Sequence, residues 1–316
     1  MADHTLLQRV QERHGIPGWV DLQVNGTHGI SFCDPSLTLD RVIEATEKIV
    51  ASGTSRYLAT VITSPPEVTR HCLRVLGEAC NDRTISEHLL GIHLEGPFLS
   101  PDVGARGAHP PEFMQLPNLE LFQQFQEAAN GHIRLLTLAP ELPGAFALIE
   151  KISDSVTCCS GHTLAGYTEH WEAVSAGLKL GTHIGNGIPS QLDRHDNPVI
   201  AQLAISELVC SFIPDGFHLP PGFIRAVLEA KGTDGCFVVS DQTHVAGMPP
   251  GEYSFGTTPA VLEDNGFLHM RDGPYLAGSS RTMAQCMEHL DSLSALDDLN
   301  LVKLGYEIPL TVIAAR

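Results

Sequence analysis

The chain has 316 residues, of which 43% are hydrophobic, so it is long enough to bury a sizeable core. Its 37 acidic residues outnumber the 19 basic residues and give a formal net charge of −18. This acidic excess argues against binding to nucleic acid or to anionic membranes, and an anionic ligand would need local positive groups or a metal ion.

The eight cysteines form no CxxC pair, and Cys158 and Cys159 lie in an apolar run that is typical of core thiols. The chain shows no disulfide framework, which favours a reducing compartment. The N-terminal residues lack a basic region followed by an apolar one, so no signal peptide is predicted. No apolar run approaches the roughly 18 residues that a membrane span needs. We therefore expect a cytoplasmic protein.

Short apolar and β-branched runs alternate with helix-like patterns along the chain. The runs that predict strands cover residues 19–25, 57–63, 89–95, 133–139, 155–160, 178–183, 208–213 and 236–240. Helical spacing between them includes residues 39–52, 66–79, 168–176 and 222–231. This alternation favours a parallel sheet, and eight units at a spacing of roughly 30 residues fit a (β/α)8 barrel. A doubly wound open sheet is the alternative, although no GxGxxG sequence follows the first strand.

Other segments lie outside this alternation. Residues 1–16 are polar and look like a leader or a short helix, and residues 282–293 predict another helix. Residues 251–278 contain two hairpin-type turns, at 264–266 and 272–273, which predict a β-hairpin insert. Residues 301–316 are mildly apolar and have no obvious partner. We expect one domain over residues 1–316, with a core barrel over about residues 17–292.

The third predicted strand ends in His93 and Glu95, and a carboxylate at the mouth of an apolar strand is costly unless it is paired. Barrel enzymes place their chemistry at the C-terminal ends of the strands. The polar residues expected at those ends are Gln23, Asn25, His93, Glu95, His162, His183, Asp215, His218 and Asp241.

Four of these residues, from the third, fifth, sixth and eighth strands, predict one metal centre. Glu95, His162 and His183 form a ligand set typical of zinc that leaves a position for water. A divalent ion would lower the pKa of that water from about 15.7 toward 7, and Asp241 would take its proton. Taken singly, each residue also has a structural interpretation, such as a salt-bridged Glu95 or a helix N-cap at Asp241. His93 lies deeper, so a role behind the ligands and a purely structural role both stay open.

Several short motifs occur in this sequence in a fixed order. Residues 91–98 read GIHLEGPF and residues 107–110 read GAHP. Further motifs are PGWVD (17–21), TLAPE (137–141), SGHT (160–163), GTH (181–183), DGFH (215–218), VSD (239–241) and LAGSS (276–280). Together they resemble the N-acetylglucosamine-6-phosphate deacetylase family of the amidohydrolase superfamily.

The resemblance implies a metal-dependent amidohydrolase barrel with one divalent ion, zinc or else iron, manganese, cobalt or nickel, bound by Glu95, His162 and His183. Asp241 matches the catalytic acid/base, and His109 matches a catalytic histidine that contacts the sugar and helps to polarise the acetyl carbonyl. The implied substrate-binding residues are His109, Asn186, Gly187, Arg194 and His218, of which the last two match a phosphate-binding pair. In the family some of these groups come from a neighbouring subunit, so a homodimer is expected.

Three features depart from related sequences. Many amidohydrolases have His-x-His at the first strand, whereas this chain has the amides Gln23 and Asn25, which are weak zinc ligands and predict a single metal ion. The family usually has a bulky aromatic residue followed by Asn-Ala-Met after the third ligand, whereas residues 185–188 read GNGI, which leaves the sugar loop more room or more mobility. The family's small β-sandwich domain looks absent or vestigial in this chain.

The expected activity is hydrolysis of the N-acetyl amide of an amino sugar. The first candidate is N-acetylglucosamine 6-phosphate, which would give glucosamine 6-phosphate and acetate. Two alternatives stay open: an amidohydrolase that acts on a different amide or N-acyl substrate through the altered loop, and a non-catalytic relative that binds sugar phosphates. The presence of Asp241 favours an enzyme, because binding alone does not need a proton shuttle.

Overall fold

Eight parallel strands form one sheet in the computed structural model, which describes residues 5–255, 258–273 and 275–314. Along the sheet they are β1 (Trp19–Val24), β4 (Thr54–Ile62), β5 (Leu89–Glu95), β6 (Ile133–Leu138), β7 (Thr157–Ser160), β8 (Leu180–Gly181), β9 (Val209–Phe212) and β10 (Cys236–Val238). A parallel bridge between Val24 and Gln242, just beyond β10, closes the sheet on itself. The predicted (β/α)8 barrel is therefore confirmed, and the open-sheet alternative is wrong.

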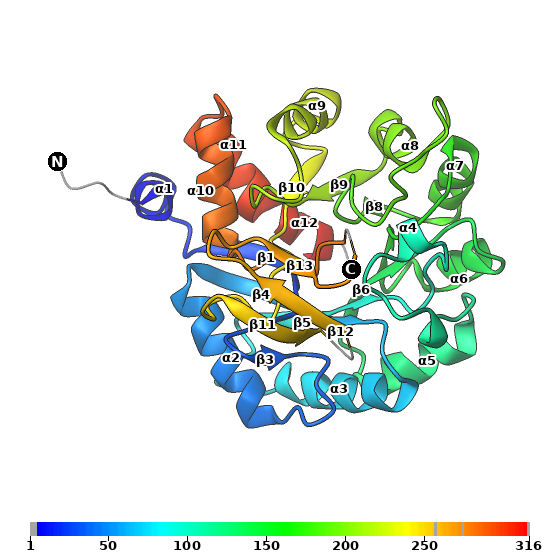
Figure 1. The fold of residues 1–316 in the computed structure, drawn as a ribbon, viewed down its shortest axis with the longest axis horizontal. Coiled ribbons are helices and arrows are strands. Elements are labelled where there is room, and N and C mark those ends of the chain that lie inside the picture. Colours follow the sequence, from blue (N-terminus) through cyan, green and yellow to red (C-terminus); the bar gives the residue numbers. More distant parts are fainter. Residues whose placement is uncertain (1–4, 256–257, 274, 315–316) are drawn as a thin grey trace.

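Helices surround the strands (Figure 1). They are α2 (Leu39–Ala51), α3 (Pro66–Ala79), α5 (Leu119–Ala128), α6 (Ala145–Ile152), α7 (Tyr167–Ala176), α8 (Pro198–Ala204), α9 (Pro221–Lys231) and α10 (Met283–Leu293), with a short α4 (Val103–Arg106) and a 3-10 turn (Pro111–Phe113) between β5 and α5. The helix predicted over residues 66–79 is confirmed with the same bounds, since Pro66 occupies the first turn, where a missing N–H costs nothing. None of the helices in the described part of the chain has the length and apolarity to cross a bilayer.

The C-terminal segment closes one end of the barrel. After α11 (Asp298–Val302) and a π-helix (Lys303–Glu307), α12 (Ile308–Ala314) lies in the middle of the ring of strands in Figure 1. Its apolar side chains pack against barrel residues such as Val20, Leu58 and Phe237. Thr157, the first residue of β7, donates to the carbonyl of Val312, so α12 covers the N-terminal ends of the strands. Residues that showed no partner in the sequence therefore complete the core.

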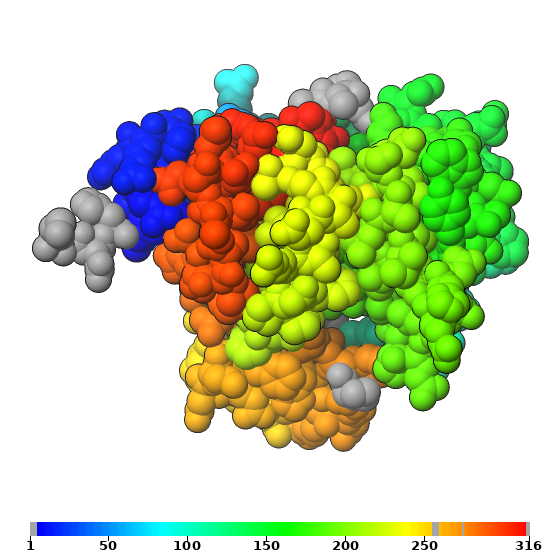
Figure 2. All heavy atoms as spheres, turned by 90° about the horizontal axis from the view of Figure 1, so that it is seen from above, coloured from blue at the N-terminus to red at the C-terminus, as the bar shows by residue number. Residues whose placement is uncertain are grey.

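The insert after β10 has three antiparallel strands instead of a single hairpin. They are β11 (Gly251–Phe255), β12 (Thr258–Leu262) and β13 (Leu268–Met270). A small apolar cluster that includes Ala260 and Leu268 holds this sheet against Val245 and Ala277. The insert forms a lobe on one side of the barrel, drawn in orange in Figure 2. A two-stranded hairpin, β2 (Gly26–Thr27) and β3 (Ile30–Ser31), follows β1, and α1 (Leu6–His14) packs beside α10.

Candidate active site

The four predicted metal-centre residues sit at or just beyond the ends of four strands. Glu95 is the last residue of β5, whereas His162 and His183 follow β7 and β8 and Asp241 follows β10. These last three have φ angles of 51°, 33° and 51°, a left-handed region that residues other than glycine rarely adopt. The strand predicted over residues 178–183 ends at Gly181, because His183 has left the extended conformation. Such strain is typical of functional positions.

The ligand atoms of Glu95, His162 and His183 converge on one another. Nε2 of His183 lies 2.9 Å from Oε1 of Glu95, and Nε2 of His162 lies 3.2 Å from the same oxygen. The two Nε2 atoms are 3.2 Å apart. Zinc binds such atoms at about 2.0–2.2 Å, so tetrahedral ligands sit roughly 3.3 Å from one another. The residues that the sequence nominated therefore fit a single cation.

A backbone carbonyl fixes the tautomer of His162. Its Nδ1 lies 2.8 Å from the backbone carbonyl of Ala105, and since a carbonyl can only accept, Nδ1 carries the proton. The lone pair of Nε2 then faces Glu95, which is the orientation that a metal ligand needs.

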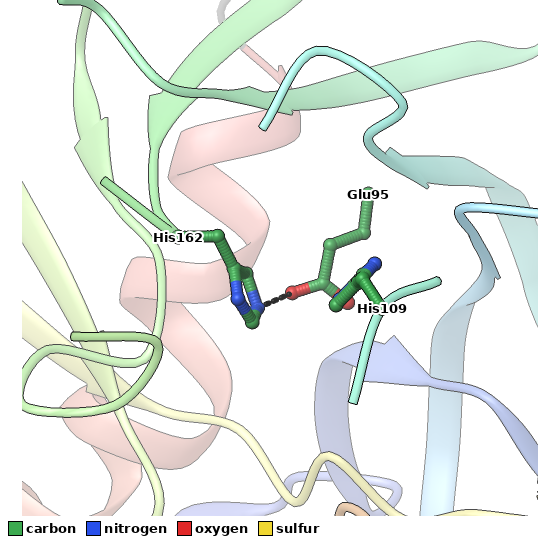
Figure 3. Close-up of side chains that lie close together, drawn as sticks. All are labelled: Glu95, His109 and His162. Carbon is green, nitrogen blue, oxygen red and sulfur yellow. Dashed lines mark ion pairs between the residues drawn. The ribbon is translucent and has the colours of Figure 1, made fainter. Parts of the chain in front are cut away.

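His109 belongs to the same cluster. Glu95, His109 and His162 each offer a ligand atom within 4.8 Å of the others, and Figure 3 shows the three side chains gathered together. The rings of His109 and His162 are 4.3 Å apart, and Nδ1 of His109 lies 3.0 Å from the hydroxyl of Thr63. Burial is the main cause that lowers the pKa of His109 to about 3. His109 is therefore a neutral imidazole at physiological pH.

Two amide side chains hold Asp241. They belong to Gln23, in β1, and to Asn25, the residue that follows β1. Nδ2 of Asn25 and Nε2 of Gln23 donate to Oδ1 of Asp241 at 2.7 and 3.1 Å. Gln23 also donates to both carboxylate oxygens of Glu95 at 3.2 Å. Burial, with the charge of Glu95 next in size, raises the pKa of Asp241 to about 7. A carboxyl group with a pKa near the working pH can both take and give a proton.

Asp21, in β1, has a contact that the sequence did not reveal. It is fully buried, and both the hydroxyl and the backbone N–H of Ser240 donate to its carboxylate. The backbone N–H of Gln23 donates to the same group. Asp21 therefore ties the strand that carries Gln23 to the residue that precedes Asp241.

His93 lies outside the cavity lining. Its Nε2 is 2.7 Å from the hydroxyl of Thr137, which in turn is 2.8 Å from the hydroxyl of Thr182. The side chain is buried and does not line the cavity. This geometry fits a supporting residue beneath Glu95 and gives His93 no access to substrate.

A cavity of about 220 Å³ opens above the cluster. Its lining contains most of the predicted site, namely Glu95, His109, His162, His183, Asn186, Gly187, His218 and Asp241. Tyr275 and Leu276 follow the insert and also line the cavity. Leu276 is the first residue of the LAGSS motif and Tyr275 precedes it, which was the one signal for them in the sequence. Arg194 is exposed and lies outside the lining of its own chain's cavity.

The glycines after His183 serve close packing. A Cβ on Gly187, whose φ is +61°, would lie 2.7 Å from Nδ1 of His162. A Cβ on Gly185, whose φ is +89°, would lie 2.7 Å from the ring of Phe223. The sequence predicted extra room or mobility here, whereas in the structure the missing side chains let the backbone pack closely against His162 and Phe223.

Known proteins are similar to the chain over most of its length. N-acetylglucosamine-6-phosphate deacetylase from Bacillus subtilis (strain 168) is 32% identical over 280 residues, which cover 87% of this chain and 69% of that protein. N-acetylgalactosamine-6-phosphate deacetylase from Shewanella sp. (strain ANA-3) is 30% identical over 297 residues, covering 93% and 73%. A solved mutant of N-acetyl-D-glucosamine-6-phosphate deacetylase from Mycobacterium smegmatis, in complex with N-acetyl-D-glucosamine-6-phosphate, has a TM-score of 0.86 at 28% identity and covers 95% of this chain and 77% of that one. No protein-family profile matches the chain.

A closed barrel with a glutamate, two histidines and an aspartate at its strand ends defines a hydrolase barrel of the amidohydrolase superfamily. The identity to deacetylases extends over more than two thirds of their length. The chain belongs to the N-acetylglucosamine-6-phosphate deacetylase family, as the motifs predict.

Proposed function

We propose that the chain hydrolyses the acetyl amide of N-acetylglucosamine 6-phosphate and releases glucosamine 6-phosphate and acetate. The observation that carries this proposal is the convergence of Glu95, His162 and His183 in the cavity that also contains Asp241. A cation site beside a carboxyl group that can hold a proton suits amide hydrolysis. The named relatives support an amino-sugar phosphate as the substrate.

The proposed cofactor is one divalent ion, with zinc as the first candidate. Glu95, His162 and His183 would hold it, and one carboxylate with two imidazoles is a donor set that zinc accepts. When bound, such an ion polarises the acetyl carbonyl and activates water. Gln23 and Asn25 direct their amide nitrogens at carboxylates, which supports one ion instead of two.

The side chains of this protein then move the protons. Asp241 takes a proton from water as the water oxygen attacks the acetyl carbon. It gives that proton to the amine nitrogen as the C–N bond breaks, so acetate and the free amine leave. His109 stays neutral, and with the Thr63 hydroxyl donating to its Nδ1, its Nε2–H donates to the carbonyl oxygen while negative charge develops there.

We also propose that two copies of the chain form a homodimer in which Arg194 reaches the phosphate bound by the neighbouring subunit. Arg194 is exposed on a loop that is joined to α7 by Asp196, which accepts the backbone N–H of Tyr167. Exposed apolar side chains on and beside this loop are Leu164, Tyr167, Trp171, Leu192 and Ile200. A bidentate guanidinium suits phosphate, and an apolar surround suits a subunit interface.

The eight free thiols support a reducing compartment, the cytoplasm.

The test is acetate release by the purified, metal-loaded protein. The panel contains N-acetylglucosamine 6-phosphate, N-acetylgalactosamine 6-phosphate, both unphosphorylated sugars and other N-acyl and cyclic amides. We expect turnover of N-acetylglucosamine 6-phosphate, with Asp241→Asn as the inactive control. Release of acetate from none of the sugars by a folded, metal-loaded protein would contradict the proposal. Turnover of another amide alone would favour an amidohydrolase with a different substrate. Tight binding without turnover would favour a non-catalytic protein that binds sugar phosphates. Light scattering measures the oligomeric state, and a monomer would contradict the dimer.

A further inference from the structure

The cavity proposed to take a phosphorylated sugar has little positive charge of its own. Its described lining includes the carboxylates of Glu95 and Asp241 but neither lysine nor arginine. Since the whole chain has a formal charge of −18, an anionic ligand needs a cation within the site. Apart from the histidines grouped around Glu95, His218 is the lining residue that can become cationic.

Asp215 holds His218 in place. Oδ2 of Asp215 lies 2.8 Å from Nδ1 of His218, and Oδ1 accepts the backbone N–H groups of Phe217 and His218 at 2.9 Å. The hydroxyl of Ser279 donates to Oδ2 at 2.8 Å and so ties the loop after β9 to the segment after the insert. Only 1% of the Asp215 side chain and 4% of the His218 side chain are exposed. The carboxylate therefore meets four donors in a nearly water-free setting.

This arrangement decides which nitrogen His218 offers to the cavity. Because a carboxylate only accepts, Nδ1 carries a proton, and Nε2 is left for a ligand. With Nε2 unprotonated, His218 would present a lone pair that repels phosphate, whereas the imidazolium presents an N–H and a full charge. Burial opposes the charged form, but Asp215 outweighs it and raises the pKa of His218. Asp241 acts in the same direction. His289 and Arg281 lie beside this loop, next to Gly216 and Phe217, and the buried thiol of Cys286 lies near Asp215.

We propose that Asp215 and Ser279 are positioning residues that keep His218 as an imidazolium, and that they thereby set the preference of this chain for a phosphorylated over an unphosphorylated amino sugar. The identity of the sugar rests on the proposed function, whereas the anion-binding role rests on the geometry of this cluster. The effect is confined to ligands with an anionic group, so it differs from a general loss of structure.

The test compares kcat/KM for N-acetylglucosamine 6-phosphate and for N-acetylglucosamine in the metal-loaded wild type and its variants. Asp215→Asn keeps the shape and removes the charge, and we expect it to lower kcat/KM for the phosphorylated sugar at least about tenfold, mainly through KM. The unphosphorylated sugar should change much less. Ser279→Ala, which removes one donor, should shift the ratio in the same direction by less. Asp264→Asn, in an exposed turn of the insert, is the matched control. Equal losses on both sugars, or a wild type without preference for the phosphate, would overturn the inference.

Nitrogen NMR of labelled histidines supplies a readout that a purely structural role would not move. The resonances of His218, assigned with His218→Gln, should show a protonated ring in the wild type near pH 7 and a neutral ring in Asp215→Asn. If the wild type hydrolysed neither sugar, the proposed function would fail. The role of Asp215 would then be tested separately, by calorimetry that compares binding of glucosamine 6-phosphate with binding of glucosamine. Phosphate-dependent binding that is unaffected by Asp215→Asn, or a neutral ring in the wild type, would refute it.

Discussion

Nδ2 of Asn25 donates to Oδ1 of Asp241 across 2.7 Å, although the two residues are 216 positions apart in the sequence. Gln23 donates to the same oxygen. Two donors occupy Oδ1, so Oδ2 is the oxygen left to exchange a proton with substrate. The two amides, which are poor metal ligands, thus orient the group that we propose to carry the proton.

Asn25→Ala should therefore lower kcat while the protein keeps its metal ion. Loss of one hydrogen bond to a charged group corresponds to about 1.5–3 kcal/mol, or a decrease in kcat of roughly 10- to 100-fold. Steady-state kinetics and metal analysis on the same sample measure the two quantities. Asn265→Ala, in an exposed turn of the insert, controls for handling. An unchanged kcat would show that Asp241 needs no such orientation.

Asp241→Asn should abolish turnover without emptying the metal site. The amide has nearly the same shape but cannot take a proton, so we expect a loss of about 10²–10⁴-fold in kcat. Glu95, His162 and His183 are unaltered in this variant, so metal content should equal that of the wild type. Substantial residual activity would assign the proton transfer to another group.

Removal of the ion should destabilise the protein and stop acetate release. A ligand that binds only the folded state stabilises it by about 2.7 kcal/mol at a concentration 100 times its Kd. We expect a chelator to lower the melting temperature of the wild type, and one equivalent of zinc to restore it. His183→Ala should show neither response, since it removes a member of the ligand cluster. A chelator response in His183→Ala equal to that of the wild type would contradict the assignment.

Gly187→Ala should cost both stability and activity. The new Cβ would lie 2.7 Å from Nδ1 of His162, and the φ of +61° is itself unfavourable for alanine. We expect a loss of about 1–3 kcal/mol in the free energy of unfolding, together with weaker metal binding. Gly222→Ala is the matched control, because a Cβ there meets no atom within 4 Å and the residue lies in the first turn of α9. If the two variants were equally stable, the close packing of the loop would not matter.

The stability of the protein should depend on Asp215 in acid. Burial would raise the pKa of this carboxyl, but the charge and hydrogen bond of His218 and two backbone N–H groups lower it from 3.8 to about 2. Because the pKa of Asp215 is lower in the folded than in the unfolded protein, the ionised carboxylate stabilises the folded state above pH 3.8, by about 2 kcal/mol. This contribution is lost as the pH falls through about 2. Denaturant titrations from pH 6 to pH 2 should show the wild type losing this advantage over Asp215→Asn. A difference that stays constant with pH would contradict the ion pair.

The barrel itself could be predicted because its signals are local. The strand over residues 89–95 and the helix over residues 66–79 have the predicted bounds, since burial of a parallel strand and the first-turn proline of a helix are both visible in short windows. The end of the strand predicted over residues 178–183 was less accurate. The strand β8 ends at Gly181, and His183 adopts a left-handed backbone conformation that residue type does not reveal.

Residue identity and order alone nominated Glu95, His162, His183 and Asp241, because a carboxylate or imidazole at the end of an apolar strand is costly to bury unless it has a partner. Only the tertiary structure decided what surrounds them: α12 beneath the barrel, the amides of Gln23 and Asn25 on two carboxylates, and the hydroxyl of Ser279 on Asp215 behind His218. The physical reason is distance along the chain. Hydrogen bonds between residues more than 60 positions apart depend on how the ring of strands closes, and no local pattern in a sequence records that closure.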